Sequence, residues 1–333
     1  MMLTGLPYGA LPEDTAEYML GDIVVTVVLM ESNGVVDTST EDWNQNTINA
    51  AKAKVQEGMQ WWEDALANYG PWLSDPTPTP VHSLNFILDF QYADQPVQTD
   101  YEPISRISND YVLWVDDFLE VAGFDTPATI DSDIRAFNHS QREAYDADWA
   151  FTIFVVNDEV DVNGRFEPGG DFQRAFAFSG GRFLISPAGR PASTFAHETG
   201  HIFYARDEYE TSGGSYTDRR GYYNSQNLNA WDNPDAGFVQ AASLMASDDL
   251  LDAAYAADIS SESSLAMVGW QDSDGDGVFD VLDVPLTLTG YGYYDPVSGL
   301  YKFQGHSSVN TLPNANGSGR QNDITINEVS VAE

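Results

Sequence analysis

The sequence predicts a mixed α/β protein of the α+β class, with a twisted mixed sheet in its larger part and a small all-β appendage. Between residues 20 and 204, β-like runs alternate with stretches of helical periodicity. After residue 205 the chain becomes rich in Gly, Asn, Ser and Tyr, and beyond residue 271 only short β-like runs remain. We therefore expect one domain over residues 1–270, with lobes at about 20–204 and 205–270, and a second module over residues 271–333.

Each element of the first lobe follows from the spacing of its apolar residues. A β-branched run predicts a buried strand, and apolar residues at three- and four-residue steps predict the long helix after it. Gly70 and Gly123 end two helices, and the Gly180-Gly181 pair divides one β-like region. The predicted strands are residues 23–30, 83–90, 149–156 and one or two within 172–186; the predicted helices are 46–69, 109–122, 130–145, 192–204 and a short capped helix at 260–268; a proline-rich loop is predicted at 75–80.

The charge of the chain excludes two classes of partner. Its 333 residues carry 52 acidic and 14 basic side chains, which gives a net charge of −38, and they include no cysteine. A protein that binds nucleic acid or an anionic membrane needs a basic face, so we expect neither partner. The apolar run at 23–30 is too short to cross a bilayer. Because the chain has no cysteine, disulfides, thiolate metal sites and a cysteine nucleophile are excluded. We expect the protein to be a monomer.

The most informative segment contains the pattern His-Glu-x-x-His, formed by His197, Glu198 and His201. On a helix, residues four apart lie on one face and about 6 Å apart along the axis, so both imidazoles can reach one metal ion. Glu198 follows the first histidine and projects beside the metal, where it can hold a water molecule. The pattern therefore predicts a catalytic zinc site with Glu198 as general base.

Zinc needs a third protein ligand, and the residues alone leave two candidates. Glu208 shares the helical face of the histidines but would lie about 10 Å beyond His201 in an unbroken helix. Asp207 would lie off that face. Either carboxylate can reach the metal only if the chain turns after His201.

The segment from Thr194 to Tyr209 resembles the metzincin clan of zinc peptidases, whose long motif places the third ligand six residues after the second histidine. The run from Gly200 through Asp207-Glu208-Tyr209 is similar to the bacterial IgA-peptidase-like branch of that clan. The resemblance extends over roughly residues 20–270 in element order, but only some 20 residues carry specific motifs. It implies that Asp207 is the third zinc ligand.

The same resemblance implies a methionine turn beneath the metal, and Met245 within residues 242–247 is the candidate. It also implies that a peptide substrate pairs with an edge strand before the zinc helix, which residues 174–186 would supply. The sequence departs from the clan at Tyr204, where a glycine usually lets the chain turn. For a donor to the oxyanion, the nearby residues Tyr204, Tyr209, Arg219, Tyr222 and Tyr223 remain equal candidates.

A second metal signature begins the C-terminal module. Residues 272–283 match the spacing of an EF-hand calcium loop, with glycine at position six for the sharp turn. The candidate ligands are Asp272, Asp274, Asp276, the backbone carbonyl of Val278, Asp280 and Asp283. Because no long helix is predicted before it, the loop is similar to the Asp/Gly loops of dockerins and thrombospondin type-3 repeats. We expect a structural Ca²⁺ that fastens the tail to the larger domain.

These observations predict a secreted zinc endopeptidase that hydrolyses protein or peptide substrates and carries both Zn²⁺ and Ca²⁺. A weak calcium site suits the cell exterior, so we expect an extracellular or cell-surface location, although the chain shows no signal peptide. One alternative is a catalytically silent, calcium-stabilised surface or adhesion module. The other is a gluzincin-type zinc hydrolase whose third ligand is a distant glutamate such as Glu262.

Overall fold

A computed structural model of the chain describes residues 13–69, 82–273 and 277–282, together with the backbone of three strands between residues 286 and 331. The predicted loop at 75–80 lies outside these residues. The described part is a mixed α+β structure with seven α-helices and a mixed six-stranded sheet, which confirms the predicted fold class.

The central sheet has the strand order β2-β1-β4-β6-β5, and the short strand β3 also pairs with β1. Its strands are β1 (Gly21–Ser32), β2 (Leu84–Asp89), β3 (Val97–Thr99), β4 (Trp149–Val156), β5 (Phe176–Phe178) and β6 (Phe183–Pro187). All pairings are parallel except that of β5 with β6, which is antiparallel. The sheet therefore ends at β5, an antiparallel edge strand.

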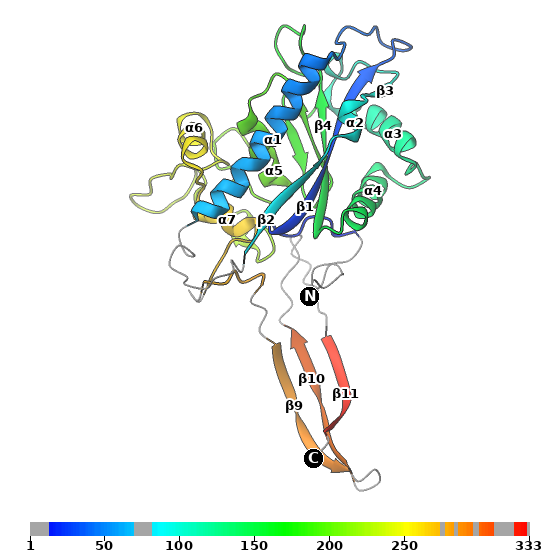
Figure 1. Ribbon diagram of the computed structural model, residues 1–333. Coiled ribbons are helices and arrows are strands. Elements are labelled where there is room, and N and C mark those ends of the chain that lie inside the picture. The colour runs from blue at the N-terminus through cyan, green and yellow to red at the C-terminus, as the bar shows by residue number, and fades with distance from the viewer. Residues whose placement is uncertain are drawn as a thin grey trace.

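Helices cover both faces of this sheet (Figure 1). The helices are α1 (Gln45–Asn68), α2 (Gln91–Asp94), α3 (Tyr111–Ala122), α4 (Ile130–Ala144), α5 (Ala192–Ile202), α6 (Asp248–Ala257) and α7 (Glu262–Met267), with two 3-10 turns at Pro103–Ser105 and Ser108–Asp110. One core cluster joins α1 and α5 to one face, and a second joins α3 and α4 to the other. Every residue of β4 is buried, as expected of a central parallel strand that is covered on both faces.

Helices α1 and α5 pack closely at a glycine. A Cβ atom at Gly58 would lie 2.9 Å from the carbonyl oxygen of Ala192, so only glycine allows this approach. Nearby, the indole N–H of the buried Trp62 donates to the carbonyl oxygen of Ala196 at 2.9 Å. These contacts fix α5, which carries His197 and His201, against the longest helix of the fold.

The predicted elements agree with the observed ones to within a few residues, with informative exceptions. The region 172–186 divides into β5 and β6 because Gly180 and Gly181 both take positive φ, 79° and 66°, in the turn between them. Helix α6, helix α2 and strand β3 were not predicted. Both α2 and β3 are too short to establish a hydrophobic period.

The chain between α5 and α6 consists mainly of loops. Between α5 and α6 the only strands among the described residues are β7 (Arg219–Arg220) and β8 (Ser225–Gln226), so this region is irregular as predicted. Phe279 is fully buried, stacks on Trp270 and donates its backbone N–H to Nε2 of His82. Part of the predicted calcium loop therefore packs into the core of the larger body.

The C-terminal strands form a separate antiparallel sheet in the order β11-β10-β9. They are β9 (Leu286–Asp295), β10 (Leu300–Val309) and β11 (Asp323–Val331), and each extends beyond the short run predicted for it. Among the described residues, no helix is both long and apolar enough to cross a membrane.

Candidate metal centre

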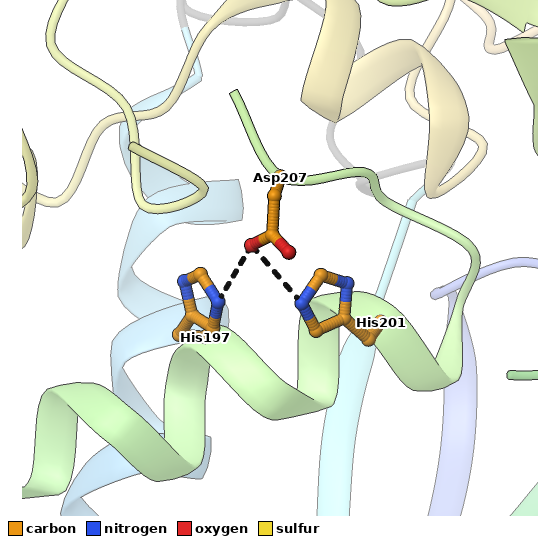
Figure 2. Close-up of side chains that lie close together, drawn as sticks. All are labelled: His197, His201 and Asp207. Carbon is orange, nitrogen blue, oxygen red and sulfur yellow. Dashed lines mark ion pairs between the residues drawn. The ribbon is translucent and has the colours of Figure 1, made fainter. Parts of the chain in front are cut away.

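Helix α5 and the loop after it bring three side chains to one point (Figure 2). His197 and His201 project from the same face of α5, and Asp207 faces them from the returning chain. The Oδ1 atom of Asp207 lies 3.1 Å from Nε2 of His197 and 3.3 Å from Nε2 of His201. One ligand atom from each residue lies within 4.8 Å of the other two, so the group could hold a metal ion.

Backbone carbonyl groups orient both imidazole rings. Nδ1 of His197 donates to the carbonyl oxygen of Leu244 and Nδ1 of His201 donates to that of Ala205, each at 2.8 Å. A proton on Nδ1 leaves the Nε2 atom of a neutral imidazole as a lone-pair donor. Both Nε2 atoms therefore point at the Asp207 carboxylate, in the position where either a proton or a metal ion can lie between these atoms.

The chain turns back toward the histidines at Tyr204. Tyr204 has a φ of 74°, in the left-handed region. The backbone N–H of Ala205 donates to Gly200 at 2.9 Å and that of Tyr204 to His201 at 3.0 Å, which is the Schellman pattern of helix termination. Tyrosine thus occupies the position where glycine is usual, at a cost of about 1–2 kcal/mol in backbone strain.

Burial of the tyrosine ring offsets that strain. The side chain of Tyr204 is almost fully buried. Its hydroxyl oxygen would lie only 2.5 Å from a Cβ atom at Gly180, so a larger residue at position 180 would collide with it. The N–H of Gly180 also donates to the carbonyl oxygen of Ile202, the last residue of α5. The glycine turn between β5 and β6 therefore makes room for Tyr204. It also donates a hydrogen bond to the carbonyl group at the end of α5.

Glu208, the other candidate ligand, does not reach the histidines. Its carboxylate is fully buried and accepts hydrogen bonds from Asn229 Nδ2 and from the hydroxyl groups of Ser261 and Ser264. Its backbone N–H donates to the carbonyl oxygen of Met245 at 2.9 Å. Glu208 therefore anchors the loop that carries Asp207 and contributes no ligand.

Met245 packs against α5 at Gly200, between the two histidines in sequence. It is fully buried in a turn closed by a hydrogen bond from Ala246 to Ser243 at 3.1 Å. A Cβ atom at Gly200 would lie only 2.8 Å from the Sδ atom of Met245, so the glycine allows this close contact. The preceding residue, Leu244, accepts the hydrogen bond from His197. The turn thus supports α5 and fixes one imidazole ring.

The two distances from Asp207 to the histidines match those expected around a tetrahedral ion. Two ligand atoms that are each about 2.0–2.1 Å from a tetrahedral zinc lie about 3.3 Å apart, close to the separations of Asp207 from both histidines. Burial lowers the pKa of His201, but the Asp207 carboxylate outweighs burial and raises that pKa to about 9. Burial likewise opposes ionisation of Asp207, yet the neighbouring histidines hold its pKa well below the ordinary value. The arrangement of these three side chains therefore favours a bound cation.

Glu198 is buried beside this group without a partner for one oxygen. Its Oε2 atom is inaccessible and forms no hydrogen bond with any described residue. Burial raises the pKa of this carboxyl group, although His201 and His197 oppose the rise. A buried, unpaired carboxylate oxygen is costly, so its presence here points to a bound species such as water at this position.

A cleft of about 680 Å³ opens over the metal centre. His197, Glu198, His201 and Asp207 form part of its wall, and the edge strand β5 forms another part. Tyr209 lines the cleft and is half-buried, and burial followed by the charge of Asp207 raises the pKa of its hydroxyl. Tyr209 therefore stays protonated at neutral pH and can donate a hydrogen bond.

Several residues considered from the sequence lie elsewhere. Arg219 is exposed and donates to Gln226, and Tyr222 packs edge-on against Tyr18. Neither these two residues nor Tyr223 belongs to the wall of the cleft. Glu262 is exposed at the start of α7 and is not part of the three-residue group. Tyr204 does line the cleft, but with a buried ring.

The predicted calcium loop is described only in part. Asp274, Asp276 and Asp283 lie outside the described residues. Gly277, at position six, has a φ of 90°, and its N–H donates to a carboxylate oxygen of Asp272. Asp280 accepts hydrogen bonds from Ser273 and Gln271. The calcium site, with Val278 as its carbonyl ligand, therefore stays a prediction.

Four arginine residues of the cleft were not predicted from the sequence. Arg165, Arg174, Arg206 and Arg220 all line it, although the chain as a whole is strongly acidic. They come from irregular segments with no motif or periodic spacing. A scan for the few cations in this chain would have singled them out, but nothing in the sequence places them near the histidines.

No protein-family model matches the chain, and neither a curated protein nor a solved structure matches it. Its function is therefore inferred from its own residues and their arrangement.

Proposed function

We propose that the protein is a zinc-dependent endopeptidase of metzincin-like type. The observation that carries the proposal is the convergence of His197 Nε2, His201 Nε2 and Asp207 Oδ1 beside Glu198, one of whose buried carboxylate oxygens has no partner among the described residues. Three protein ligands with an open fourth position are typical of catalytic zinc sites, whereas structural zinc sites are closed by four. The open position faces a cleft large enough for a peptide segment.

Glu198, and not the donor set, favours hydrolytic zinc chemistry over redox chemistry. Two histidines and one carboxylate also bind non-haem iron in oxygenases, so the ligands alone fit both metals. Glu198 favours zinc, because a buried carboxylate next to the open position serves proton transfer in hydrolysis. A zinc ion held by the three side chains supplies a Lewis acid that lowers the pKa of a water and polarises the scissile carbonyl group.

Glu198 acts as the general base and then as the general acid. Its Oε2 atom accepts a proton from the attacking water as the new C–O bond forms. The same carboxyl group then gives that proton to the amine nitrogen as the peptide C–N bond breaks. Burial suits both roles, because a pKa raised above the ordinary value makes the carboxylate a stronger base.

Tyr209 is our candidate for the donor that stabilises the oxyanion. It lines the cleft, and its electrostatic coupling to both Asp207 and Glu198 indicates a position close to the reacting atoms. A neutral phenol offers one hydrogen to the oxygen that becomes negative in the tetrahedral transition state. Tyr204 is less suited, because its ring is buried and its hydroxyl extends toward Gly180.

Strand β5 is the natural guide for an extended substrate. Among the described residues it pairs only with β6, so its other edge offers backbone N–H and C=O groups to an added strand. An extended peptide can add to such an edge as a further strand. Of the region 174–186 expected to supply this edge, only Phe176–Phe178 lies there, because β6 is internal.

The two alternative functions have less support. A catalytically silent adhesion module would have no use for a buried, unpaired Glu198. A gluzincin-type site with Glu262 as ligand conflicts with the exposed position of that residue. The calcium site in the tail and an extracellular location remain parts of the proposal that follow from the acidic loop at 272–283.

The proposed function is tested by cleavage of a mixed peptide library with zinc-loaded wild-type protein and with Glu198→Gln. We expect endopeptidase products from the wild type and a loss of about 10²–10⁴-fold in rate for the variant at unchanged zinc content. Equal rates in both proteins would contradict the role of Glu198. The absence of products from a zinc-loaded wild type would contradict the peptidase proposal itself.

A further inference from the structure

Cations gather at the cleft of a chain that is otherwise strongly acidic. The protein has a net charge of −38, yet four of its arginines line the wall of this one cleft. Arg206 is neutralised there, because it forms an ion pair with Asp218 at 2.8 Å. Arg165 and Arg174 precede the edge strand β5 and are both exposed.

Arg165, Arg174 and Arg190, here called the arginine cluster, form no ion pair with a carboxylate of any described residue. Arg165 donates to the neutral side chain of Gln173 at 3.2 Å. Arg174 has no hydrogen bond or ion pair within the described part of the chain. Arg190 precedes α5 and is half-buried, and its Nε atom is inaccessible and forms no hydrogen bond with a described residue.

Arg165 and Arg174 line the wall of the cleft, and Arg190, which is not part of that wall, lies close enough to interact with both of their charges. Burial lowers the pKa of Arg190, and the positive charges of Arg174 and Arg165 lower it further. Glu198 acts on Arg190 in the opposite direction, which places the cluster within electrostatic reach of the metal centre. Asp158 also partly offsets the charge of Arg190, whereas Arg165 and Arg174 form no ion pair with a described residue, so an anionic ligand would reduce the remaining repulsion.

Asp171, an acidic residue in the wall of the cleft, forms no ion pair with the cluster among the described residues. Asp171 lines the same cleft, but its carboxylate accepts a hydrogen bond from the side-chain amide of Asn109 at 3.0 Å. Its backbone N–H donates back to the same side chain. Asp171 is thus held toward Asn109, and the guanidinium groups stay available to an external anion.

We propose that the arginine cluster is a subsite for a carboxylate group of the substrate, so that the protein selects acidic peptides. A planar guanidinium group binds a carboxylate through two parallel hydrogen bonds, which gives both affinity and orientation. The proposal rests on the proposed peptidase function and names its substrate class. The carboxylate belongs either to an Asp or Glu side chain within the peptide or to its C-terminus.

The surrounding surface strengthens this selection. The protein carries a net charge of −38, so the molecule as a whole repels an acidic peptide, and the arginine cluster offers a local site of opposite charge. A local positive field in a narrow cleft directs an anionic ligand to that position. The effect must weaken with salt, because charges that are exposed to solvent are screened at about 8–10 Å at physiological ionic strength.

The test uses binding as well as cleavage, so that this inference and the peptidase function can fail separately. Zinc-loaded Glu198→Ala protein is titrated with four fluorescent peptides that carry either Glu or Gln at one position and either a free or an amidated C-terminus. We expect about fivefold tighter binding of the peptides that contribute the recognised carboxylate, at low salt. The Glu/Gln pair and the acid/amide pair show which carboxylate is recognised.

The variant that decides the matter is Arg174→Gln, made in the same background. Arg174 is exposed and has no partner to lose, so the fold should persist, which the melting temperature verifies. We expect the preference for the carboxylate to fall to about twofold or less. Lys52→Gln is the matched control, because it removes one positive charge from α1, where Lys52 pairs with Asp94, and should leave the preference intact.

The outcomes are distinct. Equal affinity for all four peptides, or a preference that survives Arg174→Gln, would overturn the carboxylate subsite. Selective binding by the Glu198→Ala protein without any cleavage by the wild type would keep the subsite and overturn the peptidase function. Cleavage by the wild type without charge preference would keep the peptidase function and overturn the carboxylate subsite.

Discussion

The backbone N–H of Glu208 donates to the carbonyl oxygen of Met245 at 2.9 Å, which joins the loop carrying Asp207 to the turn beneath the zinc-helix candidate. The residue before Met245 orients His197, and the residue before Glu208 is the carboxylate that faces both histidines. One hydrogen bond therefore connects the supports of two candidate ligands. The buried Glu208 side chain fastens the same loop to Asn229 and to α7.

Glu208→Gln tests this positioning role. The amide replaces one acceptor oxygen by a donor, so at least one of the donors from Asn229, Ser261 and Ser264 loses its partner in a buried site. We expect a loss of about 1–3 kcal/mol in the free energy of unfolding, measured by urea denaturation. We also expect zinc affinity to fall by about 10-fold or more, as for other residues that position ligands.

Glu210→Gln is the matched control, because Glu210 is exposed two residues farther along the chain. Its stability and zinc affinity should equal those of the wild type. If Glu208→Gln loses stability but binds zinc normally, Glu208 supports the fold alone and has no role in placing Asp207.

Asp207→Asn tests the third ligand. The substitution keeps the shape of the side chain and removes the negative charge that faces the two imidazole rings. Because a neutral amide is a poor zinc ligand, we expect bound zinc to fall well below one equivalent in metal analysis of the dialysed protein. Asp235→Asn, at an exposed position, should retain full zinc. A zinc content equal to that of the wild type would remove Asp207 from the ligand set.

The acidic loop at 272–283 predicts stabilisation by calcium. Ligand binding to the folded state alone raises stability with ligand concentration. We expect the melting temperature to fall when a calcium-selective chelator is added and to recover with excess Ca²⁺. The substitution Asp272→Asn should reduce this response, since Asp272 stands at the first position of the predicted loop. A melting temperature that changes neither with the chelator nor with excess Ca²⁺ would contradict the structural calcium site.

Stability should depend on pH through Glu31, at the end of β1. Burial is the main cause that raises its pKa from 4.5 to about 7, and the nearby carboxylates of Asp42 and Glu102 add to the rise. A carboxyl group with a raised pKa holds a proton in the folded state over a range in which the unfolded state has released it. The folded state is therefore destabilised as pH rises from about 4.5 to about 7.

The variant Glu31→Gln removes this contribution and keeps an oxygen that can accept the hydrogen bond from the N–H of Trp43. We expect the free energy of unfolding of the variant to exceed that of the wild type at pH 7.5, with the difference shrinking toward pH 4.5. Glu120→Gln, at an exposed position on α3, controls for the general loss of one negative charge. A difference that is the same at both pH values would contradict the role of Glu31.

The sequence predicted most of the main elements because each carries its own local signal. The run at β4 is continuously apolar and buried, and α1 has a clear helical period over 24 residues. His197, Glu198 and His201 were recognisable because their spacing on one helix is itself the chemical requirement. These features depend on residues that are neighbours in the chain.

The remainder depends on tertiary contacts that leave no local pattern. Tyr204 adopts a positive φ because Gly180, far away in the sequence, leaves room for its ring. Glu208 turns from the histidines because Asn229, Ser261 and Ser264 hold its carboxylate. The arginine cluster is assembled from irregular segments before β5 and before α5, so no periodicity could have predicted it.

The most direct measurement is an anomalous-difference map at the zinc absorption edge, from crystals grown with stoichiometric zinc. The account predicts one strong peak about 2.0–2.2 Å from His197 Nε2, His201 Nε2 and a carboxylate oxygen of Asp207, with Glu198 beside its open position. A peak held by other residues, such as Glu262, or no peak between the two histidines would contradict it.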